Sequence, residues 1–164
     1  MPDEKAQDLR KYEKSLPISL LRAREATTRY FKPYIDCHDL TMPQWRVLRA
    51  LAEEEGLDAR TLSERCVILP PSLTRIFRSL TQRGLISQVG CDDARRHRVM
   101  LTDAGRALFE SVVRASEPDY ERLSAAFGAE RLDSLLNLLS ELRDTVEDMN
   151  ARDADPQARK AANG

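Results

Sequence analysis

Hydrophobic residues recur at intervals of three and four along most of the chain, which is the pattern of amphipathic helices. In the clearest case, Leu73, Ile76, Phe77 and Leu80 share one side of a segment whose other side is polar. The pattern predicts helices at residues 16–36, 41–54, 58–66, 71–83 and about 102–126, and a last one after Gly128. We therefore expect a mainly helical protein.

Local signals mark where these helices begin and end. Thr41 followed three residues later by Gln44 matches a capping box, and Asp58 suits the N-cap of the short third helix. Gly84 is expected to end the fourth helix. Residues 85–89 and 98–101 are predicted to form two short strands, joined by a polar, arginine-rich tip at 90–97. This hairpin is the one β element that the sequence indicates.

The chain has 164 residues, of which 41% are hydrophobic and 32% charged, so one folded domain with a real core is expected. No apolar run approaches the ~18 residues that span a bilayer, and residues 1–14 lack a secretory-type apolar stretch, so no membrane association is expected. The three cysteines, Cys37, Cys66 and Cys91, are odd in number and far apart, which does not favour a disulfide framework. We expect a cytoplasmic protein.

Charge is unevenly distributed along the chain. Between residues 60 and 98, eight arginines and three carboxylates give +5, which leaves −6 for the rest of a chain whose net charge is −1. The arginines are Arg60, Arg65, Arg75, Arg78, Arg83, Arg95, Arg96 and Arg98. The planar guanidinium suits phosphates and guanine edges. A local contact with a polyanion is therefore predicted.

Two short helices joined by a tight connection and followed by a hairpin predict a winged helix-turn-helix. The fourth helix would enter the major groove of DNA and the hairpin tip would reach phosphates or the minor groove. The predicted DNA-binding residues are Pro71, Ser72, Thr74, Arg75, Arg78, Arg95, Arg96 and His97. Free amides at the start of the fourth helix would also favour a phosphate. The alternative is an ordinary solvated helix face and a charged hairpin whose carboxylates pair internally.

The fold class expected is mainly α with a small β-hairpin wing. The winged helix-turn-helix, 41–101, would lie between an N-terminal dimerisation helix, 15–40, and C-terminal dimerisation helices, 102–150. A flexible arm is predicted at 1–14 and a disordered tail at 151–164. The last helix carries the apolar stripe Leu132, Leu135, Leu136, Leu139, Leu142, Val146 and Met149, which predicts an interface between protomers. Packing against the first helix of the same chain is the alternative.

The most specific motif combines Asp93-Ala94-Arg95 with Leu101-Thr102 and Gly105. It resembles the wing and following helix start of the MarR family of winged-helix transcription regulators, and the resemblance extends over about residues 15–149. It implies a triangular homodimer with helical dimerisation ends and two winged lobes that bind double-stranded operator DNA. It further implies that Asp93 braces an arginine so that Arg95 enters the minor groove, and that Thr102 caps the next helix.

Within that family the chain is similar to the regulators of homoprotocatechuate (4-hydroxyphenylacetate) degradation operons. The segments that carry this similarity are residues 15–26, 40–41 with 44–46, 66–69 before 71–74, and 127–130. The resemblance implies a repressor released by a hydroxylated phenylacetate or a related aromatic acid. A ligand of this kind would shift the spacing of the two recognition helices by favouring one conformation.

Members of this family often bind aromatic carboxylates between the dimer helices and the DNA lobe. Such a site needs a cation, an apolar wall and a hydroxyl partner. The candidates are Arg22, Arg24, His38, Trp45 and Arg46. Our hypothesis is that Arg24 or Arg46 pairs with the carboxylate and that Trp45 covers the ring. The alternative is that these arginines form salt bridges between helices and Trp45 belongs to the core.

Other classes of function would make different use of the chain's residues. A redox-sensing regulator would use Cys37 beside His38, although the family's peroxide sensors keep their cysteine nearer the start of the first helix. A winged-helix protein-interaction module would have the same fold but would lack the basic face that binds DNA. Two histidines in separate elements do not favour a metal site, and the sequence has no motif of phosphate-loop or nucleophilic catalysis. We expect no enzyme activity, no metal and no cofactor.

Overall fold

The computed structural model describes residues 12–89 and 98–154. Its elements are η1 (Tyr12–Lys14), α1 (Leu16–Asp36), α2 (Met42–Glu53), β1 (Leu57–Asp58), α3 (Ala59–Cys66), α4 (Pro70–Gln82), β2 (Ile86–Val89), β3 (Arg98–Leu101), α5 (Asp103–Phe127) and α6 (Ala129–Ala154). The chain forms two compact units, Met1–Ser116 and Glu117–Gly164, so that the boundary lies within α5. The mainly helical fold with a small wing, predicted from the sequence, is confirmed.

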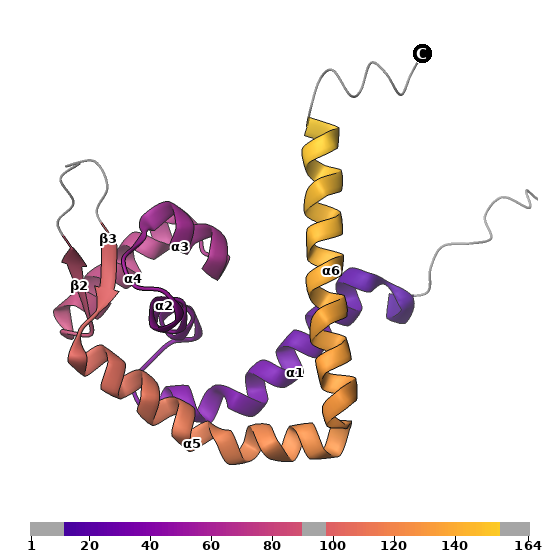
Figure 1. Ribbon diagram of the computed structural model, residues 1–164, viewed down its shortest axis with the longest axis horizontal. Helices are drawn as coiled ribbons and strands as arrows, with labels where there is room; N and C mark the ends of the chain where they lie inside the picture. The colour runs from indigo at the N-terminus through magenta and orange to yellow at the C-terminus, as the bar shows by residue number, and fades with distance from the viewer. Residues whose placement is uncertain (1–11, 90–97, 155–164) are drawn as a thin grey trace, which may run out of the picture. The chain divides into compact units, whose positions relative to one another are not determined.

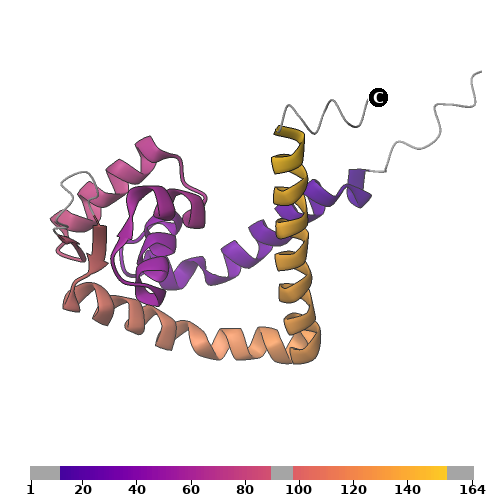
Figure 2. The same ribbon diagram turned by 45° about the horizontal axis from the view of Figure 1, so that its top comes forward.

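The core of the first unit lies between α2, α3, α4 and the strands, which gather together in both views (Figures 1 and 2). Leu48, Leu51, Leu62, Leu73 and Leu80 are buried almost completely in this core. Their spacing follows the apolar stripe of each helix, because a helix returns a side chain to the same face every three or four residues. Burial of these stripes orients α4 with its polar side outward.

The sheet has three antiparallel strands in the order β1–β3–β2. In β2, Ile86 pairs with Leu101 and Val89 pairs with Arg98, which is the predicted hairpin. The sequence analysis missed β1, in which Leu57 pairs with Val99. A two-residue strand is too short to show alternating hydrophobic and polar positions. It is recognised only by its pairing with a neighbouring strand of the sheet.

The predicted helix starts at α2 and α3 are confirmed. The Thr41 backbone N–H donates to Gln44 Oε1 at 2.8 Å, and the Gln44 N–H donates to Thr41 Oγ1 at 3.4 Å, which completes the capping box. Asp58 Oδ1 accepts from the Thr61 N–H at 2.8 Å at the start of α3. These caps satisfy amides that have no partner within the helix.

The two predicted flexible ends need correction at their inner limits. Residues 12–14 of the predicted arm form η1, and α6 continues through residues 151–154 of the predicted tail. A helix that has already formed adds residues by one backbone hydrogen bond each, without needing a further apolar stripe. Residues 1–11 and 155–164 lie outside the described residues. In the part of the chain that the structure describes, no helix is long and apolar enough to cross a membrane.

Candidate nucleic-acid interface

The connection between α3 and α4 is held by local hydrogen bonds. The Ile68 N–H donates to the Ser63 carbonyl at 3.0 Å, and Ser63 Oγ donates to the Ile68 carbonyl at 2.6 Å. Ile68 is buried, whereas Val67 and Leu69 on either side of it are exposed. Val67 ends α3 in the left-handed conformation with φ 51°. The start of α4 is thereby fixed relative to α3.

The exposed side of α4 carries the predicted recognition residues. Pro71, Ser72, Thr74, Arg75 and Arg78 are all exposed, as the sequence predicted. Within the described chain, Arg75 and Arg78 have no hydrogen-bond or ion-pair partner. Two unpaired guanidinium groups on one helix are available to an anionic partner without breaking any contact of the folded protein.

The expected phosphate site at the free amides of this helix is not supported. The helix begins at Pro70 rather than Pro71, so two residues without an N–H occupy its first positions. The next two amides, of Ser72 and Leu73, both donate to the Leu69 carbonyl at 3.0 Å. Thr74 Oγ1 also bonds back to the Pro70 carbonyl, at 3.1 Å. The first turn of α4 therefore has no amide left for a phosphate.

The predicted wing residues Asp93, Arg95, Arg96 and His97 lie outside the described residues, which resume at Arg98. Hydrogen bonds of Thr102 hold the base of the wing. Thr102 Oγ1 donates to the Gly84 carbonyl at 2.6 Å and accepts from the Gly105 N–H at 3.0 Å. Thr102 therefore caps α5, as the family motif implied, and ties the start of α5 to the end of α4.

Polar links also join α4 and its C-cap to α2 and to the connection between α1 and α2. Gln44 Nε2 donates to Ser79 Oγ at 3.1 Å. The Arg83 guanidinium donates to the Asp39 carbonyl at 2.7 Å and to the His38 carbonyl at 2.9 Å. The sequence analysis counted Arg83 only as one charge of the basic segment. Its role depends on partners more than forty residues away, for which the sequence carries no local signal.

We predict that Arg83→Ala lowers the free energy of unfolding by about 1 kcal/mol, because two charge-assisted hydrogen bonds to backbone carbonyls are lost at an exposed site. Affinity for DNA should fall as well, since α4 loses one of its anchors. Urea unfolding and a DNA titration measure the two effects, and Gln82→Ala at the neighbouring exposed position is the control. Unchanged stability and affinity in Arg83→Ala would contradict this role.

The candidate effector residues lie on α1, α2 and their connection. Trp45 is half-buried and stacks on Phe109 of α5, with ring centroids 5.3 Å apart and an interplanar angle of 21°. Arg24 is exposed and pairs with Glu25 at 3.7 Å. No hydrogen bond or ion pair joins any two of the five candidates in the described chain. Phe109 was missed, although its spacing from the buried Gly105 and Val112 gave a signal.

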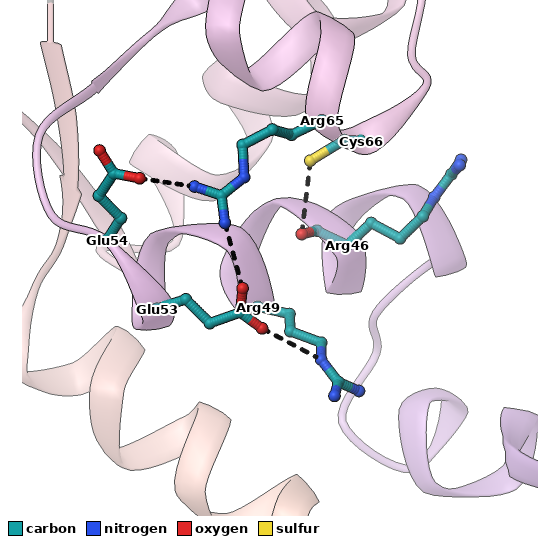
Figure 3. A network of polar contacts seen from close by, with 6 residues as sticks. All are labelled: Arg46, Arg49, Glu53, Glu54, Arg65 and Cys66. Atoms are coloured by element: carbon teal, nitrogen blue, oxygen red, sulfur yellow. Dashed lines mark hydrogen bonds and ion pairs between the residues drawn. The ribbon is translucent and has the colours of Figure 1, made fainter. Parts of the chain in front are cut away.

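Arg46 does not form the inter-helix salt bridge that was the alternative for it. Its backbone carbonyl accepts from Cys66 Sγ at 3.5 Å, while its side chain extends away from the neighbouring ion pairs (Figure 3). The link between α2 and α3 is made instead by Arg65, which pairs with Glu53 at 3.1 Å and Glu54 at 2.8 Å. Arg46 is half-buried and has no carboxylate partner among the described residues.

The described cysteines differ in their surroundings. Burial raises the pKa of the Cys66 thiol, which opposes formation of a reactive thiolate. Cys37 is exposed, and its Sγ donates to the Tyr34 carbonyl at 3.2 Å. Among the described residues, no three histidine, cysteine or acidic side chains gather as metal ligands. The redox-sensing alternative through Cys37 stays a prediction.

The two short helices, the rigid turn, the exposed basic face of α4 and the hairpin together define a winged helix-turn-helix DNA-binding protein. The sequence profile of the MarR family matches residues 38–97. The homoprotocatechuate degradative operon repressor of Escherichia coli is 40% identical over 128 residues, which span 77% of this chain and 86% of that protein. The chain belongs to the MarR family, and it is a transcription regulator rather than an enzyme.

Solved structures agree with this assignment. NadR in complex with 4-hydroxyphenylacetate is 32% identical, with a TM-score of 0.76, and the match covers 82% of this chain and 99% of that one. The transcriptional repressor CouR, bound to a 23-mer DNA duplex, is 26% identical with a TM-score of 0.74, over 83% of this chain and 97% of that one. The family resemblance stated from the sequence is confirmed.

Proposed function

We propose that this regulator is a homodimeric repressor of an operon for the breakdown of an aromatic acid, released from its operator by an aromatic carboxylate of the hydroxyphenylacetate type. The observation that carries the proposal is the 40% identity to the homoprotocatechuate operon repressor over most of that protein's length. The 4-hydroxyphenylacetate bound to the similar NadR supports the ligand class.

Exposed apolar side chains on the terminal helices support the dimer. Helix α6 has no buried residue in the described single chain, although Leu135, Leu136, Leu138, Leu139, Val146 and Met149 are large and apolar. Leu16, Leu20 and Leu21 are similarly exposed at the start of α1. Apolar area of this extent on one chain is typical of a surface that a partner covers. We assign dimerisation to residues 15–40 and 102–150, and DNA binding to residues 41–101.

For the DNA contact, we assign α4 to the major groove through Pro71, Ser72, Thr74, Arg75 and Arg78. The wing residues Arg95, Arg96 and His97 would add contacts to phosphates or the minor groove, with Asp93 as a brace. The unpaired state of Arg75 and Arg78 supports the assignment of α4, since neither guanidinium has a hydrogen-bond or ion-pair partner in the described chain.

For the effector, we assign the carboxylate contact to Arg46, with Trp45 as the aromatic wall. The half-buried position of both residues and the lack of an ion-pair partner for Arg46 in the described chain support this choice. Arg22, Arg24 and His38 remain secondary candidates. Trp45 is adjacent to Gln44, which donates to Ser79 of α4, and it lies in the helix that follows the connection whose His38 carbonyl accepts from Arg83. Ligand binding would therefore act on the links that orient α4.

We predict that Arg46→Ala weakens binding of 4-hydroxyphenylacetate about tenfold or more, because a charge-assisted contact to the carboxylate is lost. Isothermal titration of the free protein measures this affinity. The matched control is Arg60→Ala, since Arg60 is exposed on α3 and pairs with Glu64 at 3.0 Å. An unchanged affinity in Arg46→Ala would remove Arg46 from the site.

The proposal as a whole is tested by an operator-release screen on the DNA upstream of the protein's own gene. Phenylacetates, benzoates, cinnamates and peroxides are added to the preformed complex. Release by hydroxylated phenylacetates alone is the expected result. Release by peroxide alone would favour the redox-sensing alternative, and lack of any DNA binding would favour a protein-interaction module.

A further inference from the structure

The connection that leads into α4 exposes apolar side chains that the fold does not use. Val67 is 82% exposed and Leu69 is 75% exposed, and both are followed by the exposed Pro70 and Pro71. Single exposed hydrophobic residues are common on protein surfaces, but here four of five successive residues are apolar and exposed, and the fifth, Ile68, is buried. We call Val67, Leu69, Pro70 and Pro71 the apolar turn.

Val67 is also the residue type least suited to its backbone conformation. Its φ of 51° lies in the left-handed region, where a β-branched side chain is an outlier and glycine or asparagine is favoured. The side chain is exposed, so burial does not offset this strain. Strain of this kind persists mainly where a residue serves a function. The valine side chain is therefore better explained by a contact outside the protein than by folding.

The chemistry around the apolar turn identifies the partner. The first turn of α4 has no amide for a phosphate, and the Thr74 hydroxyl is bonded to the Pro70 carbonyl. Arg75 and Arg78 follow in the second and third turns of α4 and are unpaired in the described chain. A fitting partner is therefore anionic along its backbone and presents apolar groups where the helix begins. Duplex DNA has this combination in its major groove, where the C5-methyl of thymine is the apolar group on the base edges.

We propose that Val67 and Leu69 contact thymine C5-methyl groups in the major groove and so select thymine at operator positions next to the start of α4. The inference rests on the proposed binding of DNA through α4. It adds a readout by carbon–carbon contact, separate from the hydrogen bonds that arginine side chains make to guanine. The apolar turn thus sets a base preference, while the arginines supply affinity for the backbone and for guanine.

The test removes only the methyl groups. The duplex that the protein protects upstream of its own gene is synthesised with thymine, and again with deoxyuridine at every thymine position. Binding of the full-length wild-type protein to the uracil duplex should be weaker by about fourfold for each contacted methyl, the factor that corresponds to burial of one methyl-sized group. Leu69→Ala should weaken binding to the thymine duplex and discriminate less between the two duplexes.

A second variant separates this effect from damage to the fold. Val67→Asn removes the branched side chain at a position where asparagine tolerates the left-handed conformation. Its melting temperature should equal or exceed that of the wild type, while its preference for the thymine duplex decreases. A third duplex, with uracil only outside the protected segment, should bind the wild type as tightly as the all-thymine duplex.

The outcomes distinguish this inference from the proposed function. If the wild type binds the thymine and uracil duplexes equally, the thymine readout is wrong while DNA binding stands. If both variants keep the full thymine preference, the apolar turn does not contact the methyl groups and the proposal is wrong. If the wild type binds neither duplex, the proposed function fails and the inference fails with it.

Discussion

Replacing Arg75 and Arg78 together by alanine is expected to weaken binding to the operator duplex by about 30-fold to 10⁴-fold, at ~1–3 kcal/mol for each arginine. The melting temperature should stay unchanged, because neither side chain has a partner in the described protein that the substitution would remove. A large loss of affinity without loss of stability is therefore the signature of a direct contact with DNA. Fluorescence anisotropy with labelled duplexes and thermal unfolding measure the two quantities.

The single variants separate base contacts from phosphate contacts. If Arg75 contacts a base edge, Arg75→Ala relaxes the preference at one operator position. If it contacts a phosphate, binding weakens equally on all sequences and the slope of log affinity against log salt falls by about one. Arg60→Ala, on the neighbouring helix α3, is the matched control and should retain nearly full affinity. Wild-type affinity in the Arg75→Ala, Arg78→Ala double variant would contradict the assignment of α4 to the groove.

The second large effect is expected at Gly105, where α5 crosses the start of β2. A Cβ at this position would lie 2.0 Å from the Leu85 carbonyl oxygen and 3.3 Å from Leu101 Cδ2. A contact of 2.0 Å with a backbone atom is relieved only if α5 moves, which would disturb the Thr102 links to Gly84 and Leu85. Gly105→Ala should therefore lower the free energy of unfolding by about 3 kcal/mol or more. The melting temperature should fall by roughly 10 °C.

The exposed neighbour Ala104 supplies the control for this change. Ala104→Ser alters the same helical turn without a buried contact, and we expect an effect within about 0.5 kcal/mol. Circular dichroism during heating compares the three proteins. If Gly105→Ala and the wild type have the same melting temperature, the close approach of the Leu85 carbonyl does not explain the glycine that follows Leu101-Thr102 in the family motif.

Helix boundaries were the most predictable part of the fold because their causes are local. A cap such as Thr41 with Gln44, or Asp58 with Thr61, joins residues three apart, so the sequence alone contains both partners. The apolar stripes of α2, α3 and α4 are equally local, and Leu48, Leu62 and Leu73 are buried as their spacing predicts. The exposed face of α4 followed directly, because a helix with one buried side presents the other to solvent.

Two predictions failed, one because a distant segment decides the outcome and one for a local reason. The two residues of β1 become a strand only when Leu57 meets Val99, which is 42 positions along the chain. The phosphate site at the start of α4 failed for a nearer reason: the helix begins one residue earlier than predicted, so Pro70 joins Pro71 within it. The two prolines have no N–H, and the amides of Ser72 and Leu73 are both bonded to the Leu69 carbonyl.

The amino-acid sequence by itself determined the winged helix-turn-helix, the family and the arginines on the outer side of α4, because these depend on periodicity, caps and motifs within short stretches. Only the tertiary structure decided which polar groups orient α4 and which remain unpaired. Gln44 reaches Ser79 and Arg83 reaches His38 and Asp39 across long separations in sequence. Arg75 and Arg78 find no partner in the described chain. Arginine side chains thus stabilise the fold where packing brings a partner within reach. Where packing brings no partner, they stay available to a ligand.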